Sequence, residues 1–257
     1  MPKHPLEILP PKKIKTKIDY PNLHPNIWDI NEGQAVIQLG KIKSGKTVRL
    51  LNYFYNPAFY LNKLDIIYLF TPTLNNDNLN RHYKNDPKFV CFDEYSDMTL
   101  QSIIDTQEAL KQKDGEAPKI SIVFDDILTM LKQNDLAYKL ASNFRHYNIR
   151  LLIYNTQKLS GVPPVVRSNA TGVCISKFNS MTQEQKIFEE YEPFIPDFKK
   201  YYEEYTAKPY SFVMIKLDKN PAEIYNQFVT KLYPSDSTKE QISEEVNKKR
   251  RDKKLNS

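Results

Sequence analysis

The order of apolar and polar positions predicts strands that alternate with helices over most of this chain. Short apolar runs, typical of buried strands, occupy residues 34–39, 64–70, 88–92, 119–124, 149–156 and 170–176. Apolar positions at helical spacing lie at residues 46–55, 99–113 and 135–147. This order predicts an α/β fold with a central, mostly parallel sheet flanked by helices.

The pattern changes at about residue 180. Residues 180–191 and 196–207 have the spacing of amphipathic helices, and residues 210–217 predict one more strand. Prolines without a regular period in the first 30 residues predict an extended arm, which Trp28 or Ile30 anchors to the core. We therefore divide the chain into an N-terminal arm (1–30), a core (31–180), a helical and strand extension (181–235) and a basic, disordered tail (236–257).

Composition narrows the class of protein only a little. Apolar residues make up 40% of the 257 residues, which is enough for a real core, and no apolar run is long enough to span a membrane. The formal net charge is +6, and residues 248–254 alone hold six basic residues and one acidic residue. A second basic cluster lies at residues 10–17. Basic ends on a near-neutral body indicate either contact with a polyanion or a tail that only aids solubility.

Residues 40–47, GKIKSGKT, match the phosphate-binding pattern G-x-x-x-x-G-K-[ST] between a predicted strand and a predicted helix. Glycines at these positions let the backbone turn tightly, so that successive N–H groups point at phosphate oxygens. Lys46 would reach the β- and γ-phosphates of ATP, and the Thr47 hydroxyl would bind Mg²⁺. The predicted ATP-binding residues are Gly40, Lys41, Ile42, Lys43, Ser44, Gly45, Lys46, Thr47 and Val48.

Two further polar sites follow predicted strands. Asp125 and Asp126 come at the end of IVFDDI, where one acid would hold Mg²⁺ and the next would polarise the attacking water. The alternative is that the acidic pair caps a helix that begins at Ile127. Gln157 ends the strand IRLLIYNTQ, where its amide can contact the γ-phosphate or the attacking water, or can be an ordinary polar strand end.

With these motifs in place, residues 144–178, FRHYNIRLLIYNTQKLSGVPPVVRSNATGVCISKF, resemble the corresponding block of the poxvirus-type genome-packaging ATPases. These are viral members of the FtsK–HerA group, with relatives in other large DNA viruses and virophages. All three blocks occur in the family's order, and the resemblance covers about residues 33–180. It implies a RecA-like P-loop NTPase fold of the ASCE class. One departure is Asp126, where many relatives have Glu, which is longer by one methylene.

The resemblance also implies a homo-oligomeric ring, pentameric or hexameric, that translocates double-stranded DNA and binds ATP between subunits. Such motors use an arginine finger from the neighbouring subunit. Arg145 is the first candidate because it matches the arginine before the family's sensor strand, and Arg167 is the second. The alternative for either arginine is an ion pair or a contact to a DNA phosphate.

The sequence thus favours an ATP-driven motor that packages viral double-stranded DNA, with capsid or portal-vertex proteins as partners. We expect it in the host cytoplasm, at the viral factory, or associated with the virion. Three alternatives stay open: a HerA-like translocase or helicase, a slow nucleotide-dependent switch in capsid assembly, and, less favoured, a small-molecule kinase.

Overall fold

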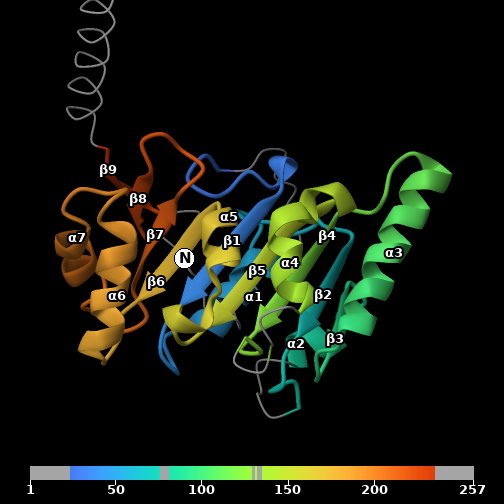
Figure 1. Cartoon of the computed structure of the whole chain (residues 1–257), viewed down its shortest axis with the longest axis horizontal. Helices are drawn as coiled ribbons and strands as arrows, with labels where there is room; N and C mark the ends of the chain where they lie inside the picture. The colour runs from blue at the N-terminus through green and yellow to red at the C-terminus, as the bar shows by residue number, and fades with distance from the viewer. Residues whose placement is uncertain (1–23, 76–80, 129–130, 132–134, 235–257) are drawn as a thin grey trace, which may run out of the picture.

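A computed structural model describes residues 24–75, 81–128, 131 and 135–234. Within these ranges the chain forms one sheet covered by helices on both faces (Figure 1). The predicted basic tail and the basic cluster at residues 10–17 lie outside the described residues. No helix in the described ranges combines the length and the apolar character needed to cross a bilayer.

The sheet has a parallel part and an antiparallel part. The described strands are β1 (Gln34–Leu39), β2 (Ile66–Phe70), β3 (Phe89–Phe92), β4 (Ile120–Asp125), β5 (Ile149–Thr156), β6 (Gly172–Ser176), β7 (Phe212–Lys216), β8 (Glu223–Asn226) and β9 (Thr230–Tyr233). Their order is β3-β2-β4-β5-β1-β6-β7-β8-β9. The first six pair in parallel, whereas β7, β8 and β9 add antiparallel strands beyond β6. The predicted parallel core is confirmed, but β8 and β9 were not predicted. Unlike the equally short β3 (FVCF), their sequences EIYN and TKLY contain no apolar run.

The helices follow the predicted positions with small shifts. They are α1 (Lys46–Tyr55), α2 (Arg81–Lys84), α3 (Asp97–Asp114), α4 (Leu136–Asn143), α5 (Pro164–Asn169), α6 (Met181–Tyr191) and α7 (Phe198–Tyr205), with short 3₁₀ turns η2 (Ile30–Glu32), η4 (Phe144–Tyr147) and η5 (Leu159–Gly161). The helix predicted over 135–147 is therefore α4 followed by η4. Phe144 stays fully buried in the 3₁₀ turn, which explains why the apolar spacing continues past the α-helix.

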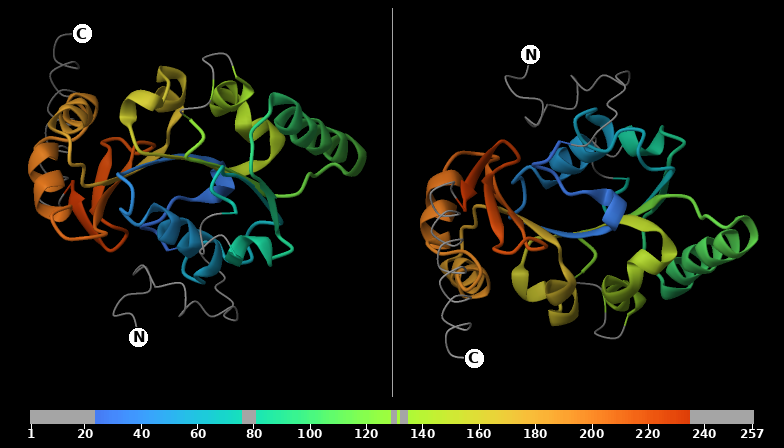
Figure 2. Two further views of the ribbon diagram at one scale, coloured as in Figure 1. Left: turned by 90° about the horizontal axis from the view of Figure 1, so that it is seen from below. Right: turned by 90° about the horizontal axis from the view of Figure 1, so that it is seen from above.

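Two apolar layers sandwich the sheet (Figure 2). Helices α1 and α2 and residues 27–30 cover one face, and α3 to α7 cover the other. Neighbouring residues of a central strand point to opposite layers, as Val36 and Ile37 of β1 do. This double cover explains why the central strands are apolar on both faces.

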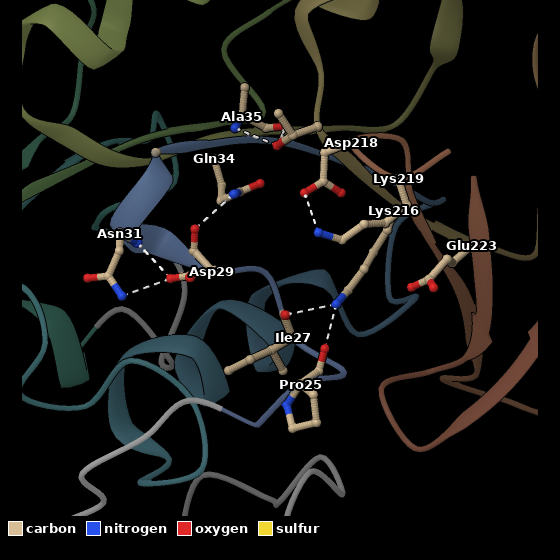
Figure 3. A network of polar contacts seen from close by, with 12 residues as sticks. Pro25, Ile27, Asp29, Asn31, Gln34, Ala35, Lys216, Asp218, Lys219 and Glu223 are labelled. Carbon is tan, nitrogen blue, oxygen red and sulfur yellow. Dashed lines mark hydrogen bonds and ion pairs between the residues drawn. The ribbon is translucent and has the colours of Figure 1, made fainter. Parts of the chain in front are cut away.

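The segment before β1 is fastened to the amino edge of the parallel strands. Trp28 and Ile30 are both buried, at 1% and 3% exposure, as the sequence predicts for an anchored arm. Lys216, at the end of β7, donates from Nζ to the carbonyls of Pro25 and Ile27 at 2.6 and 3.0 Å (Figure 3). Gly172 is required beneath this segment, because a Cβ at that position would clash with the indole of Trp28.

Candidate active site

The loop between β1 and α1 has the backbone of a phosphate cradle. Gly45 adopts a left-handed φ of 90°, which favours glycine, and directly precedes the first residue of α1. A Cβ on Gly40 would crowd the Ser44 hydroxyl, which could rotate away, and would lie 3.1 Å from Cβ of both Ser44 and Ser176, so a glycine fits this tight turn best. The N-terminus of α1 and its free N–H groups therefore point into the loop, where an anion is favoured.

Lys46 closes this loop from the inside. Its side chain is buried, and Nζ donates to the carbonyls of Gly40 and Lys41 at 2.8 and 3.2 Å. Burial lowers the pKa of Lys46, while the charges of Asp126 and Asp125 act in the opposite direction. Lys46 and the two acids thus lie at the same edge of the sheet and influence one another's charge. The hydroxyl of Ser44 is buried and has no hydrogen-bond partner among the described residues, so the loop holds a polar group that fits a phosphate oxygen.

Asp125 ends β4 at the same edge of the sheet. Its carboxylate accepts hydrogen bonds from Thr71 at 3.2 Å and from the amide of Asn155. The pKa of Asp125 is raised to about 7, first by burial and then by the charge of Asp126. Lys46 and the two hydrogen bonds shift it the other way. A cation beside Asp125 would favour the ionised carboxylate, which is the form that binds Mg²⁺.

Asp126 and Gln157 are brought together by the structure. Gln157 donates from Nε2 to Oδ2 of Asp126 at 3.2 Å, and the Asp126 N–H donates to the carbonyl of Asn155 at 2.9 Å. Asp126 has a left-handed φ of 55°. Residues other than glycine keep this backbone conformation only where the surrounding structure stabilises it. Ile127 and Leu128 are not helical, so the alternative of a helix that begins at Ile127 is not what the structure shows.

Sequence reasoning missed Asn155 and Thr71, which both hold Asp125 in place. Asn155 lies on β5 in register with Asp125 of β4 and with Gln38 of β1, so its amide stands between the acid and the P-loop strand. Thr71 directly follows β2. Polar residues at the carboxyl ends of strands that flank β4 were the available signal.

Arg145 does not reach the site of its own chain. It lies in η4, before β5, whereas Gln157 follows the other end of that strand, roughly 25 Å away at the usual rise per residue. Its Nε donates to the carbonyls of Glu32 and Gly33 at 3.1 Å each, and its guanidinium lies 4.6 Å from the ring of Phe144. The side chain is exposed, so a role towards a neighbouring subunit stays a prediction.

Arg167 is also engaged elsewhere. It lies near the end of α5 and pairs with Glu190 of α6 at 2.5 Å. This ion pair is the alternative foreseen for it, and Arg167 would have to leave Glu190 to reach a nucleotide on a neighbour. Within one chain the site therefore unites the P-loop residues, Asp125, Asp126 and Gln157, and neither arginine.

A parallel sheet with a glycine loop after β1, a buried lysine in that loop and paired acids after β4 defines a P-loop ATPase. The family model described as "Poxvirus A32 protein" matches residues 30–191. The match covers more than half of the chain, and the chain belongs to this family.

Two viral relatives are similar in sequence. "Uncharacterized protein 088R" of Invertebrate iridescent virus 3 is 28% identical over 186 residues, which cover 70% of this chain and 68% of the relative. "Uncharacterized protein 075L" of Invertebrate iridescent virus 6 is 25% identical over 169 residues, covering 65% of this chain and 63% of that relative.

Solved structures share the fold. The genome packaging NTPase B204 from Sulfolobus turreted icosahedral virus 2 in complex with sulfate has a TM-score of 0.53 at 16% identity, covering 76% of this chain and 97% of B204. Its complex with ATP-gammaS has a TM-score of 0.51 at 16% identity, covering 77% and 100%. B204 from Sulfolobus Turreted Icosahedral Virus, described as a DNA-packaging ATPase, has a TM-score of 0.54 at 16% identity, covering 74% and 95%. At these identities the likeness shows the fold.

Proposed function

We propose that this protein is an ATP-driven motor that moves viral double-stranded DNA into a capsid. The observation that supports the proposal is that Lys46, Asp125 and the Asp126–Gln157 pair all lie at the carboxyl edge of one sheet, beside the glycine loop, in a member of the Poxvirus A32 protein family. The shared fold with a genome packaging NTPase that binds ATP-gammaS supports it.

Binding begins with the loop and Lys46. In the structure, the Lys46 ammonium donates hydrogen bonds to two loop carbonyls. Oxygens of a bound triphosphate would replace these carbonyls as the acceptors. The unpartnered Ser44 hydroxyl would gain an acceptor in the same event. Thr47 and Asp125 are the residues that would hold Mg²⁺, which neutralises charge on the phosphate oxygens.

Asp126 is the group that would orient the attacking water and accept its proton. The hydrogen bond from Gln157 fixes one carboxylate oxygen and leaves the other for water. Asp is one methylene shorter than the Glu of many relatives. The left-handed backbone at Asp126 changes the direction of the side chain, and we propose that this compensates for the shorter reach.

A neighbouring subunit would complete the site. Arg145 is the better finger because it is exposed and, among the described residues, contacts neutral carbonyls and a ring, whereas Arg167 pairs with a carboxylate. An arginine finger contributes about 10³–10⁵ in rate by neutralising charge on the γ-phosphate. The proposal therefore includes a homo-oligomeric ring with double-stranded DNA in its centre and capsid or portal-vertex proteins as partners, working in the host cytoplasm or on the virion.

The test is ATP hydrolysis with and without long double-stranded DNA over a range of protein concentrations. A motor that acts as a ring shows turnover that rises with DNA and with protein concentration. Arg145→Ala is expected to bind ATP normally, to lose turnover by about 10³-fold and to inhibit wild-type protein when mixed with it. Arg167→Ala serves as the matched comparison.

Three results would contradict the proposal. Turnover that is indifferent to DNA indicates a nucleotide switch in capsid assembly instead of a motor. Full activity of a purified monomer would exclude a finger from a neighbour. Stimulation by DNA without any requirement for a capsid protein, together with strand separation, would favour the HerA-like helicase.

A further inference from the structure

The loop between α7 and β7 lies beside the phosphate cradle. A cavity of about 470 Å³ is lined on one side by P-loop residues and on the other by this loop, residues 206–211. The family match ends at residue 191, so this wall of the cavity comes from a part of the chain that the match does not cover. The loop follows α7 and enters β7, which pairs with β6 next to the P-loop strand.

Tyr210 is the most unusual residue of this loop. It is 71% exposed, although it is a large aromatic residue, and its φ of 64° lies in the left-handed region. Residues other than glycine rarely adopt this backbone conformation. Those that do are found most often at ligand sites. Hydrogen bonds from the N–H and the hydroxyl of Ser211 to the carbonyl of Lys208, at 3.2 and 2.5 Å, hold the turn.

The ring of Tyr210 is placed against the cradle. A Cβ built on Gly45 would lie 3.5 Å from Cδ1 of Tyr210, so the ring stands directly over the loop at the start of α1. Ile42, which is 67% exposed, adds a second open apolar surface to the same cavity. Ser44 also lines the cavity, and its buried hydroxyl has no hydrogen-bond partner in the part of the chain that the structure describes.

These features fit the base of a nucleotide whose phosphates occupy the cradle. An exposed aromatic ring next to a phosphate site offers a flat surface for stacking, and a purine offers the larger partner. We propose that Tyr210 is the stacking platform for the purine base of the bound nucleotide. The proposal rests on the proposed nucleotide binding at the P-loop, and it adds the α7–β7 loop to the site.

Binding of three phosphate ligands separates a contact to the base from a contact to the phosphates. Dissociation constants are measured by calorimetry for ATP, CTP and inorganic tripolyphosphate. Tyr210→Ala is expected to weaken ATP binding by about 10-fold or more, CTP binding less, and tripolyphosphate binding not at all. Tyr210→Phe keeps the ring and is expected to bind ATP like the wild type.

Phe194→Ala is the matched control, because Phe194 is also an exposed aromatic residue, at 56%, and does not line the cavity. Tyr210→Trp supplies a second readout. Its fluorescence is expected to change with ATP and to stay constant with tripolyphosphate, against the background of Trp28, which is buried at the other edge of the sheet.

The proposal is overturned if Tyr210→Ala weakens ATP and tripolyphosphate equally, since the ring would then support the cradle only. It is also overturned if Tyr210→Ala binds ATP as well as the wild type or better, since the ring would then be idle or in the way. A failure of the motor is a separate result: hydrolysis that DNA does not stimulate would remove the motor and leave the stacking of Tyr210 intact.

Discussion

Lys46 and Lys216 lie at opposite edges of one sheet in closely similar surroundings. Their residues are 7% and 4% exposed, and each ammonium donates to two backbone carbonyls. Burial is the largest influence on both, and it lowers the pKa of both. Judged by burial and pKa alone, the two lysines would be equal candidates for a functional site.

What separates them is the structure of the acceptors. Acidic side chains act on both lysines, Asp125 and Asp126 on Lys46 and Glu223 and Asp218 on Lys216. The carbonyls that hold Lys46, however, belong to a loop that turns through a left-handed glycine at the start of a helix. The carbonyls that hold Lys216 belong to a segment packed down by buried Trp28. A bound phosphate can replace the loop carbonyls as the acceptor for Lys46. Lys216 is needed to hold the segment before β1 in place. A cavity of about 690 Å³ also adjoins Lys216, so neither a perturbed pKa nor open space beside a lysine is enough to indicate a functional site. The loop backbone that holds the lysine has to be considered as well.

The largest expected effect is at the carboxyl edge of the sheet. Lys46→Ala is expected to lower ATP turnover by at least about 10³-fold, because the positive charge opposite the γ-phosphate is lost. The melting temperature is expected to stay close to that of the wild type, because the loop carbonyls released from Lys46 can accept hydrogen bonds from water. Steady-state hydrolysis and differential scanning calorimetry measure the two quantities. Turnover within about 10-fold of the wild type would contradict the assignment of Lys46.

Gly172→Ala is expected to have the largest effect on stability at the amino edge. The new Cβ would overlap the Trp28 ring. Overpacking of this kind typically lowers the free energy of unfolding by about 1–3 kcal/mol. Each kcal/mol lowers the melting temperature by about 2–4 °C in a chain of this size. Gly161→Ala is the control, because a Cβ at that position would meet one atom at 3.9 Å. Equal melting temperatures for the two variants would contradict the close packing of Trp28.

Lys216→Met sharpens the comparison of the two lysines. It removes the donor of two carbonyls, and hydrogen bonds to charged groups are worth about 1.5–3 kcal/mol. The melting temperature is expected to fall by about 5 °C, while the dissociation constant for ATP stays unchanged. A loss of ATP affinity without a loss of stability would instead make Lys216 part of the nucleotide site.

The smallest effect is a gain in stability. The pKa of Asp125 is about 7 in the folded chain against 3.8 for the ordinary carboxyl, so the folded state binds the extra proton between these values. Stability without metal or nucleotide therefore decreases as the pH rises from about 4 to 7. Asp125→Asn is expected to raise the melting temperature by a few degrees at about pH 8 in EDTA and to make little difference near pH 4.

Exposed Asp114→Asn is the control for this measurement. A melting temperature of Asp125→Asn that lies below that of the wild type at the higher pH would show that the ionised carboxylate stabilises the fold, which is the opposite of the expected effect.

Local patterns were sufficient to predict the phosphate cradle and the acidic strand end. The glycine spacing at residues 40–45 predicts a tight loop, and the apolar run before Asp125 predicts a buried strand. Because these strands are parallel, their carboxyl ends lie at one edge of the sheet. The same logic, applied to Arg145, would have placed it at the opposite edge, because it precedes the strand that Gln157 follows.

The remaining features depend on contacts between distant segments. Asn155 holds Asp125 only because β5 pairs with β4 in one register. Tyr210 reaches the P-loop only because β7 is antiparallel to β6 and so returns the α7–β7 loop to the carboxyl edge. Neither contact can be predicted from spacing along the chain. Strands β8 and β9 were missed because, unlike the equally short β3, they contain no apolar run.

The fastening of residues 24–30 has a consequence for fragments of this protein. Asn26 donates from its amide to the carbonyls of Phe228 and Val229, both at 3.0 Å, and Phe228 packs edge-on against Trp28. Segments near the two ends of the described chain are thus held against each other. A shortened polypeptide limited to residues 30–191, the region shared with the family, would leave β6 as a bare edge and Tyr53 without two of its aromatic neighbours. We therefore expect the shared region alone to be less stable than the whole chain.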